Sequence, residues 1–203
     1  MIITAVEALD KKRFKVYIDG EFAFVLYRGE LKDYGISPGQ EIGEAVVSEI
    51  TDVLLLKRAK LRAMNLLQKK DYTRKQLTDK LKEGLYPTEC IEGAISYVES
   101  YHYLDDKRFA TDYITYHMQS RSKNRIIRDL MDKGIGKDLL MPLIDEIYSE
   151  ESGEDVELEQ VKTLLVKKHY DPENCDFKEK QKIMAFLLRR GYSMETVRRA
   201  MED

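Results

Sequence analysis

The chain has 203 residues, of which 43% are hydrophobic and 35% charged, and its 34 basic and 37 acidic side chains leave a formal net charge of −3. A chain of this size can bury one sizeable core or a short row of small ones. The near balance of charge argues against a polycationic nucleic-acid binder, although it permits local basic faces such as residues 51–103, which carry ten basic and seven acidic side chains.

Several other classes of protein are disfavoured by the sequence. Cys90 and Cys175 lie far apart with no second Cys or His at ligand spacing, which argues against a zinc site or a disulfide scaffold. The first residues lack the basic and apolar regions of a signal peptide, and no long apolar run is present. We therefore expect a monomeric cytoplasmic protein without a membrane span, metal or cofactor.

Residues 1–50 are expected to form a small β-rich subdomain. Aromatic and β-branched residues alternate with polar ones over 14–18 and recur over 22–27. Asp19-Gly20 between these runs favours a type I′ hairpin, because both central residues of that turn need positive φ. A further strand over 3–9 would complete a small antiparallel sheet, which should pack against the helices that follow because it is too small to be stable alone.

Beyond residue 43 the sequence predicts helices. A short helix over 44–50 is followed by Thr51 and Asp52, which offer an N-cap. The spacing of apolar residues from Leu55 onward then predicts a helix over 52–70.

An apolar register of five positions occurs three times in the helical part. Its spacings of 4, 5, 5 and 4 residues are kept after an offset of 49 residues and again after 57. The positions are Leu77, Leu81, Tyr86, Ile91 and Ile95, then Ile126, Leu130, Ile135, Leu140 and Ile144, then Ile183, Leu187, Tyr192, Val197 and Met201. This predicts a mainly α fold, a tandem array of three three-helix repeats over 51–103, 104–151 and 152–203 behind the N-terminal β-hairpin subdomain.

The repeats have recognisable corners and one irregular connection. Gly134 and Gly191 stand where a left-handed residue ends a helix. The third repeat has eight extra residues, which segment 171–178 accounts for. The acidic, Gly-containing stretch 149–155 is the best candidate for a flexible joint between the second and third repeats.

The motif YLDDKRFA opens the second repeat and allows two interpretations. Asp105 is suited to cap a helix, and Asp106 would lie in its first turn, where the helix dipole favours a carboxylate. The alternative is a metal-binding or acid/base carboxylate pair. No His or further carboxylate stands at helical spacing to complete such a site, so the cap is favoured.

With an Arg-rich helix and the Leu-x-x-Lys-Gly-Ile corner at 130–135, this motif resembles the RecX family of recombinase regulators. Tyr103, Leu104, Asp105, Asp106 and Phe109 are its most specific part, and the YIDGEFAF hairpin and the three repeats extend the resemblance over essentially the whole chain. The chain departs from the family at three corners. His102 stands where Gly is usual, which asks for a different conformation, Leu85 takes the repeat position of Gly134 and Gly191, and Ser122-Lys123-Asn124 replaces Gly-Pro.

The resemblance implies a non-enzymatic regulator that binds RecA recombinase filaments on DNA. Such a protein interferes with the recombinase ATPase, with strand exchange and with filament growth. Basic side chains around the second helices suggest a line of contacts for phosphates or an acidic protein groove. The candidate contacts are Arg74, Lys75, Arg121, Lys123, Arg125 and Arg128.

Two other functions stay open at this point. The chain could be a helical DNA-binding module that acts without a recombinase, or, as a weaker alternative, a hydrolase using Asp105 and Asp106. The chain has 13 Tyr and no Trp. Clustered tyrosines such as Tyr97, Tyr101 and Tyr103 could stack on bases, although core and boundary packing is the simpler expectation for them.

Overall fold

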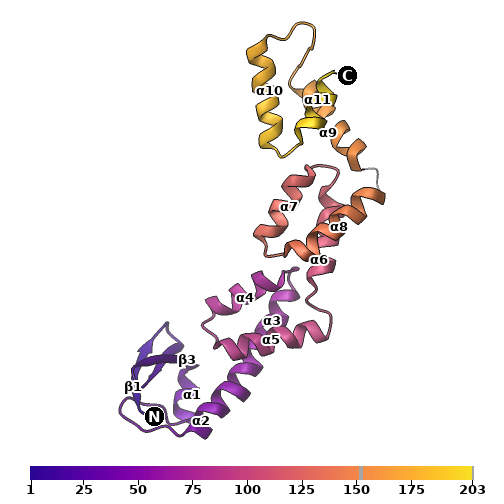
Figure 1. The fold of residues 1–203 in the computed structure, drawn as a ribbon. Coiled ribbons are helices and arrows are strands. Elements are labelled where there is room, and N and C mark those ends of the chain that lie inside the picture. Colours follow the sequence, from indigo (N-terminus) through magenta and orange to yellow (C-terminus); the bar gives the residue numbers. More distant parts are fainter. Residues whose placement is uncertain (151–152, 203) are drawn as a thin grey trace. The chain divides into compact units, whose positions relative to one another are not determined.

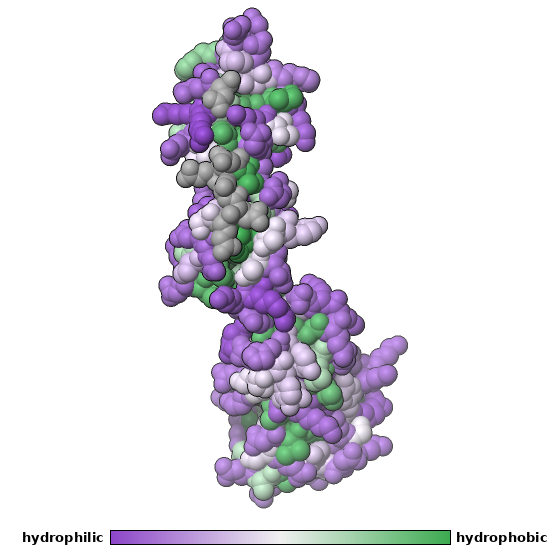
Figure 2. Space-filling model, turned by 90° about the vertical axis from the view of Figure 1, so that its right-hand side faces the viewer, coloured by the Kyte–Doolittle hydropathy of each residue, from purple (hydrophilic) through white to green (hydrophobic). Residues whose placement is uncertain are grey.

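The computed structural model describes residues 1–150 and 153–202, which divide into two compact units that meet between Asp105 and Asp106 in the chain. The chain is mainly helical with a three-stranded antiparallel sheet at the N-terminus, as the sequence predicts (Figure 1). On the face shown in Figure 2, hydrophilic residues predominate and apolar residues form separate patches. The finer division at residues 50, 103 and 151 stays a prediction.

The sheet confirms the predicted hairpin and the additional strand. Its strands are β1 (Ile3–Ala8), β2 (Arg13–Ile18) and β3 (Glu21–Tyr27), in the order β1-β2-β3. Asp19 and Gly20 connect β2 to β3 with φ of +49° and +89°, as a type I′ turn requires. The short helix α1 (Arg28–Asp33) follows β3 directly.

The next helix does not begin at Thr51 and Asp52, so the predicted N-cap is wrong. Instead α2 (Glu44–Ser48), the π-helical segment η1 (Glu49–Leu55) and α3 (Leu56–Leu67) follow one another without a break. The Thr51 hydroxyl donates to the Val47 carbonyl oxygen at 3.1 Å, one turn back in the helix. Ser and Thr make this bond inside helices as well as capping them, which is why the local signal misled.

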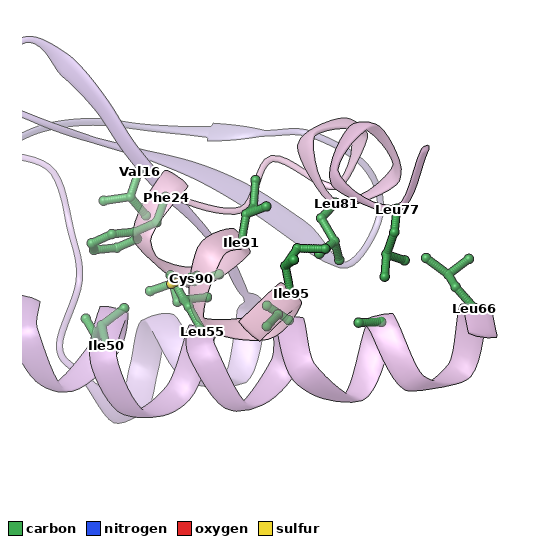
Figure 3. Close-up of a cluster of buried hydrophobic side chains, with 14 of the residues drawn as sticks. Val16, Phe24, Ile50, Leu55, Leu66, Leu77, Leu81, Cys90, Ile91 and Ile95 are labelled. Carbon is green, nitrogen blue, oxygen red and sulfur yellow. The ribbon is translucent and has the colours of Figure 1, made fainter. Parts of the chain in front are cut away.

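The sheet and the first repeat share one hydrophobic core. Helices α4 (Arg74–Glu83) and α5 (Thr88–Ser100) complete this repeat. Figure 3 shows Val16 and Phe24 of the sheet in the same buried cluster as Leu77, Leu81 and Ile95 of the helices. The sheet therefore buries its apolar face against the helices, as expected for one too small to stand alone.

The second unit contains two further repeats, each with its own hydrophobic cluster. The first of these repeats consists of α6 (Asp106–His117), α7 (Lys123–Asp132) and α8 (Lys137–Glu150). The other consists of α9 (Gly153–Lys167), α10 (Phe177–Arg189) and α11 (Met194–Glu202). The candidate joint at 149–155 includes residues 151 and 152, which lie outside the described residues.

The threefold apolar register is the buried frame of the repeats. Every one of its fifteen positions is buried except Tyr86, which is half-buried and packs against the first core. Within each helix that carries them, two register positions stand four residues apart, so they lie on one face of that helix, and the middle position lies at the corner between two helices. The polar residues between them are therefore presented at comparable places in each repeat.

The helix corners keep one conformation even where glycine is missing. Gly134 and Gly191 both have φ of +94°, as predicted, and Leu85 and His102 also lie in the left-handed region, at +59° and +56°. The expectation of a different corner at His102 is wrong. The His102 N–H donates to the Glu99 carbonyl oxygen and the Tyr103 N–H to that of Val98, so the capping hydrogen bonds offset a backbone cost of about 1–2 kcal/mol.

The extra residues of the third repeat lengthen both a connection and a helix. The chain leaves α9 through His169, turns at 172–174 and enters α10 at Phe177. Asp176 caps α10, and its carboxylate accepts a hydrogen bond from the Glu179 N–H at 2.7 Å. The predicted insertion 171–178 thus supplies the connection and the first residues of α10.

Candidate functional site

The N-terminus of α7 carries most of the predicted contact residues. Ser122 is its N-cap and is buried, and its hydroxyl accepts a hydrogen bond from the Arg125 N–H at 3.3 Å. The departure from Gly-Pro at 122–124 therefore replaces one common helix start with another, because serine is a favoured N-cap. From this start, Arg121, Lys123, Arg125 and Arg128 lie within two turns of helix.

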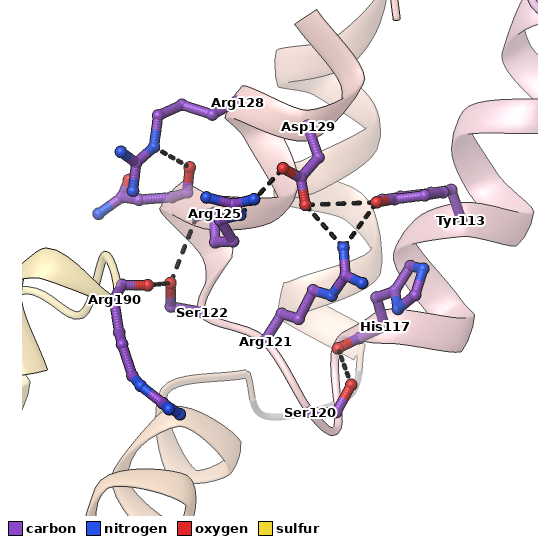
Figure 4. A network of polar contacts seen from close by, with 10 residues as sticks. Tyr113, His117, Ser120, Arg121, Ser122, Arg125, Arg128, Asp129 and Arg190 are labelled. Carbon is purple, nitrogen blue, oxygen red and sulfur yellow. Dashed lines mark hydrogen bonds and ion pairs between the residues drawn. The ribbon is translucent and has the colours of Figure 1, made fainter. Parts of the chain in front are cut away.

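Two of these arginines share one carboxylate. Asp129 accepts hydrogen bonds from the Arg121 guanidinium at 2.7 Å and from the Tyr113 hydroxyl at 3.3 Å, and it pairs with Arg125 Nε at 2.9 Å (Figure 4). The Asp129 side chain is largely buried, whereas the Arg125 side chain is 55% exposed. Two guanidinium groups on one carboxylate leave a positive charge at the surface.

The Tyr113 hydroxyl is the inner member of this cluster. It accepts a hydrogen bond from Arg121 at 2.8 Å as well as donating to Asp129. Burial raises the pKa of Tyr113, and the nearby Asp129 carboxylate adds to this effect. The hydroxyl therefore stays protonated and holds Arg121 and Asp129 in place.

Arg128 and Lys123 lie on either side of this cluster. Arg128 Nε donates to the Asn124 carbonyl oxygen at 3.4 Å. Within the described part of the chain, Arg128 forms no ion pair with a carboxylate. Lys123 pairs with Asp145 at 3.3 Å, and its ammonium lies 5.3 Å from the Tyr148 ring centroid. Around α7, arginine and lysine charges thus outnumber their carboxylate partners.

The charges of the two candidate contacts in the first unit are each compensated by a carboxylate. Arg74, the first residue of α4, pairs with Glu99 of α5, and Lys75 pairs with Asp79 one turn further along α4 at 3.2 Å. Arg74 thus corresponds to Lys123, 49 residues later, which also binds the third helix of its own repeat. Arg74 and Lys75 each have a carboxylate partner, so among the six candidate contacts the surplus charge lies on α7.

The residues of the YLDD motif take structural positions. Leu104 is buried in the first core, and Phe109 packs half-buried against the second. Asp106 lies in the first turn of α6, as expected, and Asp105 precedes it, so its capping role stays a prediction. Within the described ranges no group of three or more His, Cys, Asp or Glu side chains is arranged to hold a metal. Tyr103 is exposed.

Three side chains that the sequence analysis did not select as contacts join the second repeat to the third. Glu157 Oε1 accepts a hydrogen bond from the Lys123 N–H at 2.7 Å, and burial raises the pKa of Glu157. Asn124 Nδ2 donates to the Gly191 carbonyl oxygen at 2.9 Å, and Gln160 Nε2 to that of Met118 at 2.6 Å. Each bond joins residues 34 to 67 positions apart, so no local pattern announced it.

Ser122 belongs to the same junction. Its hydroxyl donates to the Arg190 carbonyl oxygen at 2.7 Å (Figure 4). The corner at Gly191 lies so close that a Cβ there would come within 2.6 Å of Ser122 Oγ and 3.1 Å of an Arg128 terminal nitrogen. The second and third repeats are thus joined by specific hydrogen bonds at the base of the α7 cluster.

Taken together, the fold and this surface define a tandem three-helix-repeat protein with a basic cluster on one second helix. Models of the first and third three-helix domains of RecX match residues 59–97 and 155–201. "Regulatory protein RecX" of Caldanaerobacter subterraneus is 30% identical over 99% of this chain and 98% of its own length. The chain belongs to the RecX family of regulatory proteins.

Other relatives and solved structures agree with this assignment. "Regulatory protein RecX" of Clostridium perfringens strain 13 is 29% identical over 95% of this chain and 91% of its own length. A crystal structure of regulatory protein RecX covers 100% of this chain and 99% of the solved chain, with a TM-score of 0.66 and 24% identity, and shows the same fold. RecX from Lactobacillus salivarius, at 20% identity, covers 73% of this chain and 95% of its own, with a TM-score of 0.62.

A regulatory family fits a protein that acts without chemistry of its own. Among the described helices, none combines the length and apolar character needed to cross a membrane.

Proposed function

We propose that this protein binds RecA recombinase filaments on DNA and inhibits their ATPase, strand exchange and growth, and so takes part in recombinational DNA repair. The observation that carries the proposal is the end-to-end similarity to a protein named "Regulatory protein RecX". Binding without catalysis also suits an array of small repeats, because modest contacts on linked units add up through effective concentration.

The basic residues at the start of α7, here called the α7 cluster, are the part of the chain best suited to contact the filament. They are Arg121, Lys123, Arg125 and Arg128. Arg125 and Arg128 are both exposed. Arg125 shares the Asp129 carboxylate with Arg121, and Arg128 has no carboxylate partner among the described residues. A guanidinium can take a carboxylate or a phosphate oxygen with two parallel hydrogen bonds, so either an acidic groove of the recombinase or the DNA backbone would be complementary.

The test is inhibition of the DNA-dependent ATPase of the cognate recombinase. The Arg125→Gln, Arg128→Gln variant removes two charges without placing a carboxylate beside Asp129. Its half-inhibitory concentration should rise about tenfold, because roughly two exposed charge-assisted contacts are lost. Arg198→Gln, Arg199→Gln on α11 is a matched control with the same change of charge in the same unit and should inhibit normally.

Two results would count against this proposal. If the unaltered protein at stoichiometric concentration left ATP turnover and filament length unchanged, the recombinase would not be its target. If both double variants lost inhibition equally, net charge and not the α7 cluster would be responsible. Circular dichroism of each variant should match the parent protein, so that loss of fold is separated from loss of contact.

The surplus of arginine over carboxylate on α7 also keeps the second candidate open, a DNA-binding module with no recombinase partner. Counterion release predicts that its affinity for duplex DNA falls steeply with salt. Fluorescence anisotropy with labelled duplex at several salt concentrations, with and without recombinase, separates the two. Tight salt-sensitive binding to naked duplex, with no effect on the recombinase, would favour the DNA-binding module.

A further inference from the structure

Two exposed tyrosines at the end of α5 form a stacked pair. The Tyr101 and Tyr103 rings have centroids 5.9 Å apart and planes within 14°, and Tyr97 continues the row at 5.0 Å from Tyr101. Tyr101 and Tyr103 are 56% and 51% exposed, while their neighbours Val98 and Leu104 are buried. Core packing therefore accounts for the neighbours but not for these two rings.

The corner at His102 explains why the two rings stack. His102 lies in the left-handed region, and the Tyr103 N–H returns to the Val98 carbonyl oxygen at 3.0 Å. This reversal brings two residues that are two positions apart onto one side of the helix end. The backbone hydrogen bonds fix the pair in advance, so a ligand that stacks there meets little ordering cost.

A shallow apolar groove of about 320 Å³ adjoins Tyr97, in the same unit. It is formed by η1, α3 and α5, and it includes the exposed side chains of Val53 and Leu61, at 62% and 52%. Lys57 and Lys60 stand along it, and the Lys60 ammonium lies 5.0 Å from the Tyr97 ring centroid. Cations thus stand at one end of the tyrosine row.

Two carboxylates stand near the row and the groove. Asp52 lines the groove, where it accepts a hydrogen bond from the Thr51 hydroxyl at 3.0 Å. Glu99, on α5 between Tyr97 and Tyr101, pairs with Arg74. Residues 51–103 as a whole carry an excess of three positive charges. The surroundings of the row therefore favour an anionic ligand.

We propose that Tyr101 and Tyr103, supported by Tyr97 and flanked by Lys57 and Lys60, form a base-stacking site for single-stranded nucleic acid. Exposed aromatic rings beside cations are the combination that holds single strands, because every base offers a face for stacking and every linkage a phosphate. A duplex is excluded, since its bases are already stacked on one another. The site belongs to the first unit and the α7 residues to the second, and it does not depend on the proposed recombinase contact.

The experiment measures fluorescence anisotropy of a labelled oligo(dT) of about 12 nucleotides with the full chain and no recombinase. Tyr101→Leu, Tyr103→Leu should weaken binding by at least about fivefold, since stacking is worth about 1–3 kcal/mol per base. Tyr101→Phe, Tyr103→Phe keeps both rings and should bind as the parent does. Tyr116→Leu, at an 80% exposed tyrosine of α6, is the control for loss of a surface ring.

A second oligonucleotide tests the role of the bases directly. An abasic strand of equal length carries the same phosphates and should bind the parent protein as weakly as oligo(dT) binds the Leu variant. The proposal is overturned if the Leu variant binds oligo(dT) within twofold of the parent, or if the abasic strand binds equally well. A protein segment would then be the occupant to consider. Since the assay contains no recombinase, its failure leaves the proposed function untouched.

Discussion

Replacing Gly191 by alanine should separate the second and third repeats at their shared corner. The alanine Cβ would lie 2.6 Å from Ser122 Oγ and 3.2 Å from the Arg125 backbone nitrogen, at φ of +94°. A side chain at such a φ costs about 1–2 kcal/mol. Displacing the Ser122 hydroxyl from the Arg190 carbonyl oxygen adds about 0.5–1.5 kcal/mol. Gly191→Ala should thus lower the free energy of unfolding by about 2–3 kcal/mol.

Gly39→Ala is the matched control, because Gly39 has φ of +82° but no atom within 4 Å of the added Cβ. Its free energy of unfolding should fall only by the backbone term of about 1–2 kcal/mol. Both are measured by urea unfolding followed by circular dichroism. Hydrogen exchange of peptides that cover Ile183 to Met201 shows whether the third repeat opens first in the Gly191 variant.

A double-mutant cycle with Ser122→Ala identifies the contact itself. Ser122→Ala alone loses the N-cap of α7, at about 1–2 kcal/mol. In the Gly191→Ala background, Ser122→Ala also removes the closest clash. The double variant should therefore lose at least about 1 kcal/mol less free energy of unfolding than the sum of the two single losses. Losses that add within about 0.5 kcal/mol would refute the reasoning, because the two positions would then not be in contact.

Three further substitutions test the second unit by urea unfolding. His169→Gly should stabilise by about 1 kcal/mol, since exposed His169 has φ of +53°; a loss would mean that its side chain supports the corner. Tyr148→Phe should be neutral or stabilising by up to about 1 kcal/mol, because this buried hydroxyl has no hydrogen-bond partner among the described atoms. A clear loss of stability would mean that the hydroxyl does have such a partner. Burial raises the pKa of Glu157 above its ordinary 4.5, so this carboxyl disfavours folding increasingly as pH rises from 4.5 through its folded pKa. Glu157→Gln still accepts from Lys123 and should lack that pH dependence, being at least as stable near neutral pH; lower stability at every pH would contradict this.

The fold was largely predictable because its frame is local and periodic. The register that begins at Leu77 and the glycine corners at Gly134 and Gly191 are short-range patterns, and the structure confirms them. The start of α3 was not predictable in this way, because Thr51 and Asp52 look like a cap although they lie inside a continuous helix. The left-handed backbone at Leu85 and His102 was not predictable either, since neither residue is the glycine that usually marks such a corner.

The candidate site was predictable in composition but not in detail. Counting basic residues selected Arg121, Arg125 and Arg128, but it could not show that Asp129 is shared by two of them. The partners of Ser122 and Lys123 come from the third repeat, at separations of 68 and 34 residues. Such contacts depend on how two repeats pack, and the flexible joint that we expected lies partly outside the described residues.

The shared core of the sheet and the first repeat has a consequence for synthesis of the chain. Its last buried member is Leu104, and every other residue of that core precedes it. During translation, the first unit therefore has its complete set of apolar partners once Leu104 has left the ribosome, before any of α6 is needed. Domains generally fold as units with the N-terminal one first, so the nascent chain should gain a protease-resistant fragment that ends near the YLDD motif.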